Sequence, residues 1–308
     1  MKTIAILLIA LFAPAALAQD HALVGSGSTP YTLKVDVDLA LFNVTVMDNK
    51  DRRVSGLGPE NFRIYEEGQL QTINFFRAED SPATIGLVID NSGSMSARRE
   101  MVIAAASAFA DASNPQDELF LVNFNERVSM GLPESTQFSS TNEEFRNALL
   151  SIRTSGRTAL YDALSAALKH LNRGRHQRKA LVVLSDGGDN ASTLRLSAAL
   201  EEIQQTSAMV YTVGIYDPGD KDKNPGVLRK IAKASGAEAY FPEHPSELPE
   251  IWAKIANGIR SQYTLGFTSS RPARKDEYRR VTVVATGRDG KTLRVRTRDG
   301  YQVAAVVR

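Results

Sequence analysis

The sequence predicts an α/β fold, in which a doubly wound, mostly parallel sheet accompanies a smaller β-sandwich-like domain. Two observations predict it. Between residues 82 and 260, short apolar runs alternate with helical patterns, as expected for strands and helices that build a parallel sheet. On either side of this block, polar and apolar residues alternate in the manner of half-buried strands. We therefore expect an α/β domain over 82–260, with β segments over 31–80 and 261–308.

The N-terminus has the pattern of a secretory signal peptide. Lys2 gives a positive start, an apolar run follows it, and Ala16-Leu17-Ala18 is a small-x-small cleavage site. The apolar run is too short to favour the alternative of a retained membrane anchor, and we expect no transmembrane segment after it. The expected organisation is a signal peptide over 1–18, a flexible leader over 19–30, and a secreted or periplasmic protein.

Composition excludes several classes of chemistry. The chain has 308 residues, a formal net charge of +2 and no cysteine. Disulfides, thiolate zinc sites and cysteine nucleophiles are therefore excluded. A nearly neutral chain without a basic, aromatic-rich surface pattern also makes nucleic-acid binding improbable. Nothing in the composition indicates an oligomeric state.

The two β segments are each too short for a convincing core of their own. Tyr263, Leu265 and Phe267 alternate with other residues in the C-terminal segment, and Leu33, Val35 and Val37 do so in the N-terminal one. We expect the segments to pair and form one sandwich, with the α/β domain inserted between them. The alternative is that the two segments pack separately. The arginines at 294, 296 and 298 are expected on the solvent face of a strand.

The central block predicts a regular order of elements. The leucines at 160, 164, 168 and 171 form one apolar stripe, as expected for a helix that covers the sheet. The expected strands are 84–90, 118–124, an edge strand near 127–131, 180–185, 209–215 and 238–241, and the expected helices are 97–112, 143–152, 159–171, 194–207, 226–235 and 246–260.

An oxygen-rich loop follows the first apolar strand of this block. Asp90, Ser92 and Ser94 alternate there, so one tight turn can aim three oxygens at a common point. Loops at the carboxyl ends of parallel strands form the ligand sites of open α/β sheets. An all-oxygen cluster suits a hard divalent cation such as Mg²⁺. The alternative is that Asp90 and Ser94 only cap the following helix.

Two further loops can contribute oxygens at the same edge. Thr158 stands where the leucine-striped helix begins, and Asp186 is the first carboxylate after the apolar strand 180–185. With three loops converging, the sequence favours a metal site over a simple helix cap. Asp189 could accept a hydrogen bond behind this site, but we favour a turn residue.

These residues give the chain its resemblance to the von Willebrand factor type A (VWA) domain and its metal-ion-dependent adhesion site (MIDAS). The family's D-x-S-x-S motif matches Asp90-Asn91-Ser92-Gly93-Ser94, its loop threonine matches Thr158, and its third-loop aspartate matches Asp186. The resemblance implies a Rossmann-like sheet. It also implies that Ser92, Ser94 and Thr158 contact the metal directly, and that Asp90 and Asp186 act directly or through water.

The flanking segments resemble a secreted bacterial VWFA-related subfamily. Asn61-Phe62-Arg63-Ile64-Tyr65 and Gln71-Thr72-Ile73-Asn74-Phe75-Phe76 are similar to its leader, and Tyr263-Thr264-Leu265-Gly266-Phe267 and Arg298-Asp299-Gly300-Tyr301 to its tail. That subfamily is defined by sequence more than by known activity, so this part of the resemblance adds little about ligands.

The expected function is capture of a partner protein. Three neutral hydroxyls and two carboxylates leave a divalent cation partly electrophilic, so an Asp or Glu side chain of a partner can replace a metal-bound water. We expect Mg²⁺, with Mn²⁺ or Ca²⁺ as alternatives, and no enzymatic activity. The rival hypotheses are a structural or assembly scaffold with a structural metal site, and a metal-dependent hydrolase, for which no general base is evident.

Overall fold

A computed structural model describes residues 39–78, 81–139, 141–150, 153–216, 219, 223–272, 274 and 277–303. The expected signal peptide (1–18), the leader (19–30) and the alternating residues 33–37 lie outside the described residues.

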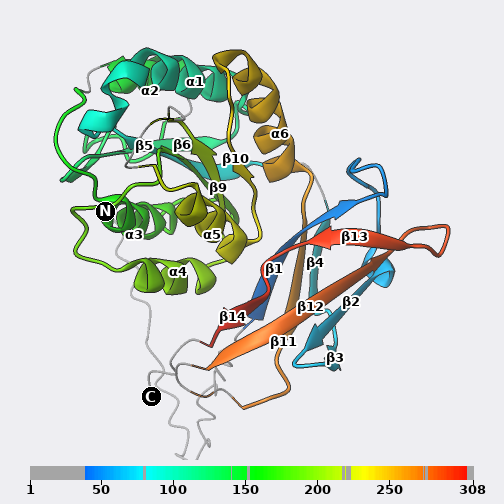
Figure 1. The fold of residues 1–308 in the computed structure, drawn as a ribbon. Coiled ribbons are helices and arrows are strands. Elements are labelled where there is room, and N and C mark those ends of the chain that lie inside the picture. Colours follow the sequence, from blue (N-terminus) through cyan, green and yellow to red (C-terminus); the bar gives the residue numbers. More distant parts are fainter. Residues whose placement is uncertain are drawn as a thin grey trace, which may run out of the picture. The chain divides into compact units, whose positions relative to one another are not determined.

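The central block forms one six-stranded sheet in the order β10-β9-β8-β5-β6-β7 (Figure 1). All neighbouring strands are parallel except β7, which pairs with β6 in the antiparallel sense. The predicted doubly wound, mostly parallel sheet is therefore confirmed. The strands are β5 (Ala83–Asp90), β6 (Glu118–Phe124), β7 (Val128–Met130), β8 (Arg178–Ser185), β9 (Met209–Gly214) and β10 (Ala239–Tyr240).

Helices cover both faces of this sheet. Figure 1 shows α1, α2 and α6 over one face and α3, α4 and α5 over the other, in agreement with the contacts between neighbouring helices. The leucine stripe of α3 is fully buried, as its spacing predicts. The helices are α1 (Arg99–Ala112), α2 (Asn142–Leu150), α3 (Leu160–Leu171), α4 (Leu196–Gln204), α5 (Pro225–Ser235) and α6 (Leu248–Arg260), with short 3-10 turns η1 (Pro59–Asn61), η2 (Gly93–Arg98) and η3 (Pro245–Glu247).

The two β flanks pair with each other and form one curled antiparallel sheet. Its order is β3-β2-β12-β13-β1-β11-β4, with β14 paired to β12. Strands of the N-terminal and C-terminal flanks are thus mixed in one sheet, for example where β1 lies between β11 and β13. The strands are β1 (Leu39–Met47), β2 (Phe62–Glu66), β3 (Gln69–Gln71), β4 (Phe75–Ala78), β11 (Tyr263–Thr268), β12 (Tyr278–Thr286), β13 (Thr292–Arg296) and β14 (Gly300–Gln302).

A core rich in aromatic residues packs within the curled sheet. Phe42 stacks on Phe267 with ring centroids 6.0 Å apart, and Phe62 packs against Tyr263 at 5.0 Å. These rings are almost completely buried. Burial of such large side chains supplies the main stabilisation of a domain without disulfides.

A buried charge network lies at one edge of this core. The Glu66 carboxylate is fully buried and accepts hydrogen bonds from Ser269 Oγ at 2.5 Å and from the Tyr301 hydroxyl at 2.6 Å. Arg279, whose side chain is 2% exposed, lies with Nη1 3.5 Å from the same carboxylate. A buried charge is tolerated when it is paired and hydrogen-bonded in this way.

The expectation for the arginine row is wrong at Arg298. This side chain is 7% exposed, lies with its guanidinium 4.5 Å from the centroid of the Phe42 ring, and donates to the carbonyls of Leu41 and Gln204. The two-residue alternation fails because β13 ends at Arg296, so the chain has left the strand before Arg298. Arg298 therefore joins the curled sheet to the end of α4.

Candidate metal centre

The centre lies where β5 and β8 reach their carboxyl ends. Asp90 is the last residue of β5, and Asp186 follows the last residue of β8. Because these strands are parallel neighbours, their two following loops meet at the same edge of the sheet. Gly187 turns the second of these loops with φ +84°, and a Cβ atom there would lie 2.4 Å from the Asn224 carbonyl oxygen. Only glycine fits this position.

Backbone hydrogen bonds join the loop after β5 to the loop before α3. Gly93 N donates to the Gly156 carbonyl at 3.0 Å, and Ser155 N donates to the Asn91 carbonyl at 2.9 Å. The loop after β8 is joined in turn to Thr158, whose carbonyl accepts from Asn190 N and Ala191 N at 2.9 Å each. The three predicted loops therefore converge and are held by the main chain.

Four of the five predicted residues are linked by oxygen contacts or line one hollow. Ser94 Oγ donates to Asp186 Oδ2 at 2.6 Å and lies 3.1 Å from Ser92 Oγ. Ser92, Ser94 and Thr158 line a polar hollow of about 140 Å³. The alternative role of Asp90 and Ser94 as helix caps finds no support, because neither η2 nor α1 has a side-chain cap.

The fifth residue, Asp90, lies directly behind this hollow and is 1% exposed. Its Oδ1 accepts from Ser92 N at 2.9 Å, and its Oδ2 accepts from Ser185 Oγ at 2.6 Å. Burial raises the pKa of the Asp90 carboxyl to about 6, against the opposing effect of these hydrogen bonds, and the nearby negative charge of Asp186 raises the pKa further. Within the described residues, Asp90 forms no ion pair.

The donor set fits a hard divalent cation. It consists of two carboxylates and three hydroxyls, which are the oxygen ligands that Mg²⁺ and similar ions prefer. A cation here would also offset the desolvation of Asp90, since a nearby positive charge favours the ionised carboxylate. Among the described residues there is no group of three or more His, Cys, Asp and Glu side chains suited to a metal, so the hydroxyls are essential to this fit.

Two neighbouring residues hydrogen-bond to predicted ones, and a third lines the same hollow. Ser185 orients Asp90, and its hydroxyl also accepts from Gly187 N at 3.0 Å. Asn190 Oδ1 accepts from Thr158 N at 2.9 Å. Asp189 is more than the turn residue that the sequence favoured: it lines the hollow and accepts from Tyr161 N at 3.1 Å. Nothing in the local sequence marks Ser185, the last residue of β8, or Asn190 as an acceptor, whereas the role of acceptor was the alternative that the sequence offered for Asp189.

No helix in the described part of the chain is long and apolar enough to cross a membrane. No curated protein is significantly similar in sequence to the chain.

The sequence model of the von Willebrand factor type A domain matches residues 84–254, which include all three loops of the candidate centre.

Solved structures with this fold are similar to the chain at low sequence identity. A von Willebrand factor type A protein from Catenulispora acidiphila is 15% identical, with 86% of this chain and 72% of that chain covered and a TM-score of 0.52. Proximal thread matrix protein 1 from the mussel byssus, with a zinc-occupied MIDAS motif, is 15% identical over 64% of this chain and 50% of its own, with a TM-score of 0.51. BatB from Bacteroides thetaiotaomicron is 18% identical over 58% of this chain and 98% of its own, with a TM-score of 0.47.

Proposed function

The chain belongs to the von Willebrand factor type A domain family, and we propose that it is an exported binding module that captures a partner protein through a divalent cation. Members of this family typically bind a divalent metal at the MIDAS and mediate metal-dependent protein interactions rather than catalysis. The proposed ligands in this chain are Asp90, Ser92, Ser94, Thr158 and Asp186. The partner would present an Asp or Glu side chain.

One observation supports the proposal above all others: two carboxylates that are each 1% exposed lie against hydroxyls at the edge of an accessible polar hollow. Two buried like charges are costly unless a cation or protonation relieves them. Asp90 and Asp186 would supply the charge that holds the ion, and Ser92, Ser94 and Thr158 would orient it toward the hollow. A bound cation supplies a coordination position that the carboxylate of a partner can take from water.

The cation that we propose is Mg²⁺, with Mn²⁺ and Ca²⁺ as the alternatives. Mg²⁺ binds few carboxylates and retains several waters, which suits a centre with two carboxylates and an accessible side. A purely structural metal is less favoured, because backbone hydrogen bonds already join the loops without one. Hydrolysis is less favoured because the carboxylates of the centre are themselves the proposed ligands.

The test is capture of partners on immobilised protein, with the envelope and medium of the source cell as the sample. We expect partners to be retained in Mg²⁺, released by EDTA and absent with Asp90→Asn. Asp48→Asn is the matched control, because Asp48 is a partly exposed carboxylate that lies beside a turn of the other domain and pairs there with Arg52. Retention that is indifferent to both EDTA and Asp90→Asn would contradict the proposal.

Export is a separate proposal that rests on residues 1–18 and on the resemblance to a secreted bacterial subfamily. Mass spectrometry of the protein from the source cell should find a mature N-terminus near Gln19 in the periplasm or the medium. An intact N-terminus on protein that stays in the cytoplasm would contradict this proposal.

A further inference from the structure

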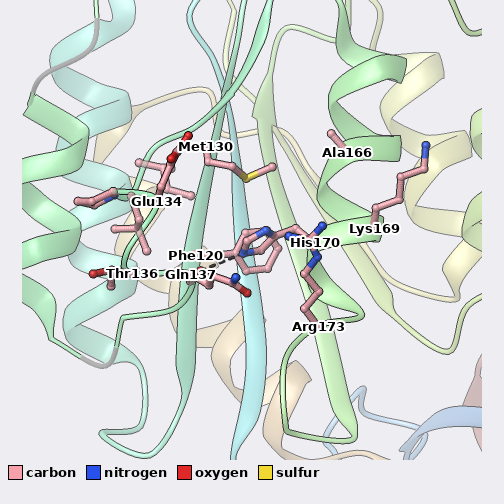
Figure 2. A pocket seen from close by; sticks show the side chains of 12 residues that line it. Phe120, Met130, Glu134, Thr136, Gln137, Ala166, Lys169, His170 and Arg173 are labelled. Atoms are coloured by element: carbon pink, nitrogen blue, oxygen red, sulfur yellow. Dashed lines mark hydrogen bonds between the residues drawn. The ribbon is translucent and has the colours of Figure 1, made fainter.

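A second hollow, of about 230 Å³, opens at the free edge of the parallel sheet. Phe120 and Leu132 are apolar, buried residues that line it, and Met130, which is 43% exposed, lines it as well. Figure 2 shows the hollow between the loop that carries Glu134 and the helix that carries Lys169. We call it the β7 hollow. No residue lines both this hollow and the polar hollow of the metal centre.

The rigid wall of the β7 hollow is built by His170 and its neighbours. His170 is buried, its Nε2 lies 2.9 Å from the Gln137 carbonyl oxygen, and its ring centroid lies 4.7 Å from that of Phe120 (Figure 2). Phe138 packs against the same imidazole at 4.9 Å. This wall is therefore fixed by packing, which is typical of preformed sites for apolar groups.

Strand β7 is the last strand of the sheet, and its outer backbone groups have no described partner. Gly131 N donates to the Leu121 carbonyl at 2.7 Å, and Asn125 N donates to the Arg127 carbonyl at 3.1 Å. The alternation of an antiparallel ladder then points the N–H and C=O groups of Val128 and Met130 away from β6. In the described part of the chain these groups form no hydrogen bond.

An exposed edge of this kind is a template for another strand. Natural edges are usually protected by a short strand length, by charge, by proline or by a bulge. β7 is short, with three residues, but Val128-Ser129-Met130 has no charged residue and no proline. In peptide recognition by strand addition, the main chain supplies hydrogen bonds and a pocket beside the edge selects a side chain. Here the β7 hollow lies where such a pocket is needed.

We propose that β7 binds an extended peptide segment as an added strand, with one apolar side chain of the peptide in the β7 hollow. Charged side chains that line the hollow determine which charge is preferred next to the apolar residue of the peptide. Lys169 and Arg173 are both exposed and form no ion pair among the described residues, whereas Glu134 is the only acidic residue that lines the hollow. The excess of positive charge favours an acidic residue beside the apolar one. Recognition at this surface requires no cation and is distinct from the proposed metal-dependent capture.

The experiment selects peptides from a phage-displayed library of random dodecapeptides, on the intact protein in EDTA. We expect enrichment of peptides that combine alternating β-branched residues, one large apolar residue and a neighbouring Asp or Glu. Selected peptides should slow amide hydrogen exchange at Val128–Met130. Failure to enrich such peptides, or protection confined to other elements, would overturn the proposal.

Ala166→Trp tests the hollow alone, and Met130→Pro tests the edge together with a side chain that lines the hollow. Ala166→Trp fills the hollow from the face of α3 that lines it, and Met130→Pro removes an outward N–H group without removing a ladder hydrogen bond. Each should weaken the selected peptides at least tenfold, and the matched control Ala198→Trp on α4 should not. Unchanged affinity in Ala166→Trp would overturn the proposal even if Met130→Pro failed to fold.

Two further tests concern the charge preference of the hollow and the self-association of the protein through β7. Lys169→Glu combined with Arg173→Glu should reverse the preference for acidic peptides at low salt, because complementary charge sets specificity at such rims. Concentration-dependent dimerisation that protects β7 without peptide would show that a second copy occupies the edge, and would overturn the assignment to a peptide partner.

Discussion

Two buried carboxylates in this protein have opposite surroundings. Glu66, in the curled antiparallel sheet, is fully buried with the Arg279 guanidinium, the Ser269 hydroxyl and the Tyr301 hydroxyl around it. Asp90, at the edge of the parallel sheet, is 1% exposed, and its described hydrogen bonds come from neutral donors.

The difference shows which of the two buried carboxylates has a positively charged partner within the chain. The Glu66 cluster contains a positive charge of its own, the Arg279 guanidinium, which also pairs with Glu277 at 2.9 Å. The Asp90 cluster combines a buried carboxylate whose pKa is raised by burial with a second carboxylate and an accessible hollow. Asp90 has no ion pair among the described residues, and a buried carboxylate of this kind is expected at functional sites, where an external ion can neutralise it.

The largest effect should come from breaking the Glu66 cluster. Arg279→Met leaves the Glu66 carboxylate buried without its counter-charge, which typically costs about 3–5 kcal/mol in the free energy of unfolding. Urea denaturation of the whole protein measures this change in the free energy of unfolding. Arg280→Met is the control, because Arg280 is an exposed neighbour on the same strand. Equal stability of the two variants would show that the Glu66 cluster is not a balanced ion pair.

Metal removal should affect only the other cluster. Mg²⁺ at about 100 times its Kd should raise the free energy of unfolding by about 2.7 kcal/mol, and EDTA should reverse the gain. Hydrogen exchange should locate the change in the loops that contain Thr158 and Asp186. Asp90→Asn should remove the response while the metal-free protein keeps its stability, since the substitution deletes a buried charge. A response of the same size in the curled sheet would contradict the comparison.

A smaller effect is expected from the residue that orients Asp90. Ser185→Ala removes the 2.6 Å hydrogen bond to Oδ2, and loss of such a positioning contact typically weakens metal affinity about 10- to 100-fold. Titration with Mg²⁺ measures the affinity. Ser165→Ala is the matched control, because its buried hydroxyl has no partner among the described residues. If the two variants bind Mg²⁺ alike, Ser185 does not position the metal centre.

The smallest change in stability is expected for an ion pair at the surface, and this change is the reference for the effects at the two buried clusters. Arg175 pairs with Glu118 at 3.1 Å while its side chain is 70% exposed. Arg175→Ala should therefore cost no more than about 1 kcal/mol, and less at high salt. A thermal melt at two salt concentrations tests it, and a loss comparable to that of Arg279→Met would remove the distinction between buried and exposed charge.

Much of the α/β domain could be predicted because its signals are local. Each apolar strand is a continuous run, and the residues of the D-x-S-x-S loop are neighbours in sequence. The first helix shows the limit of such signals: the expected start at residue 97 falls within η2, and α1 begins at Arg99. The 3-10 turn places Ser94 against Asp186, a contact between residues that are 92 positions apart.

The curled sheet shows which features of a fold local sequence patterns do not predict. Alternation predicts strands, but it does not fix which strands pair, because register depends on partners that are distant in the chain. The contact of Glu66 with Arg279 joins residues 213 positions apart, and no spacing rule points to it. The expectation for Arg298 is wrong because β13 ends at Arg296, and its carbonyl partners on α4 and β1 are likewise distant in the chain.

The central claim is that Asp90, Ser92, Ser94, Thr158 and Asp186 hold a divalent cation. Isothermal titration of Mg²⁺ into the metal-free protein tests it most directly, with Asp90→Asn titrated in parallel. The account expects saturable binding at a single site in the native chain and none in the variant. No measurable uptake by the native chain, or equal uptake by both proteins, would contradict it.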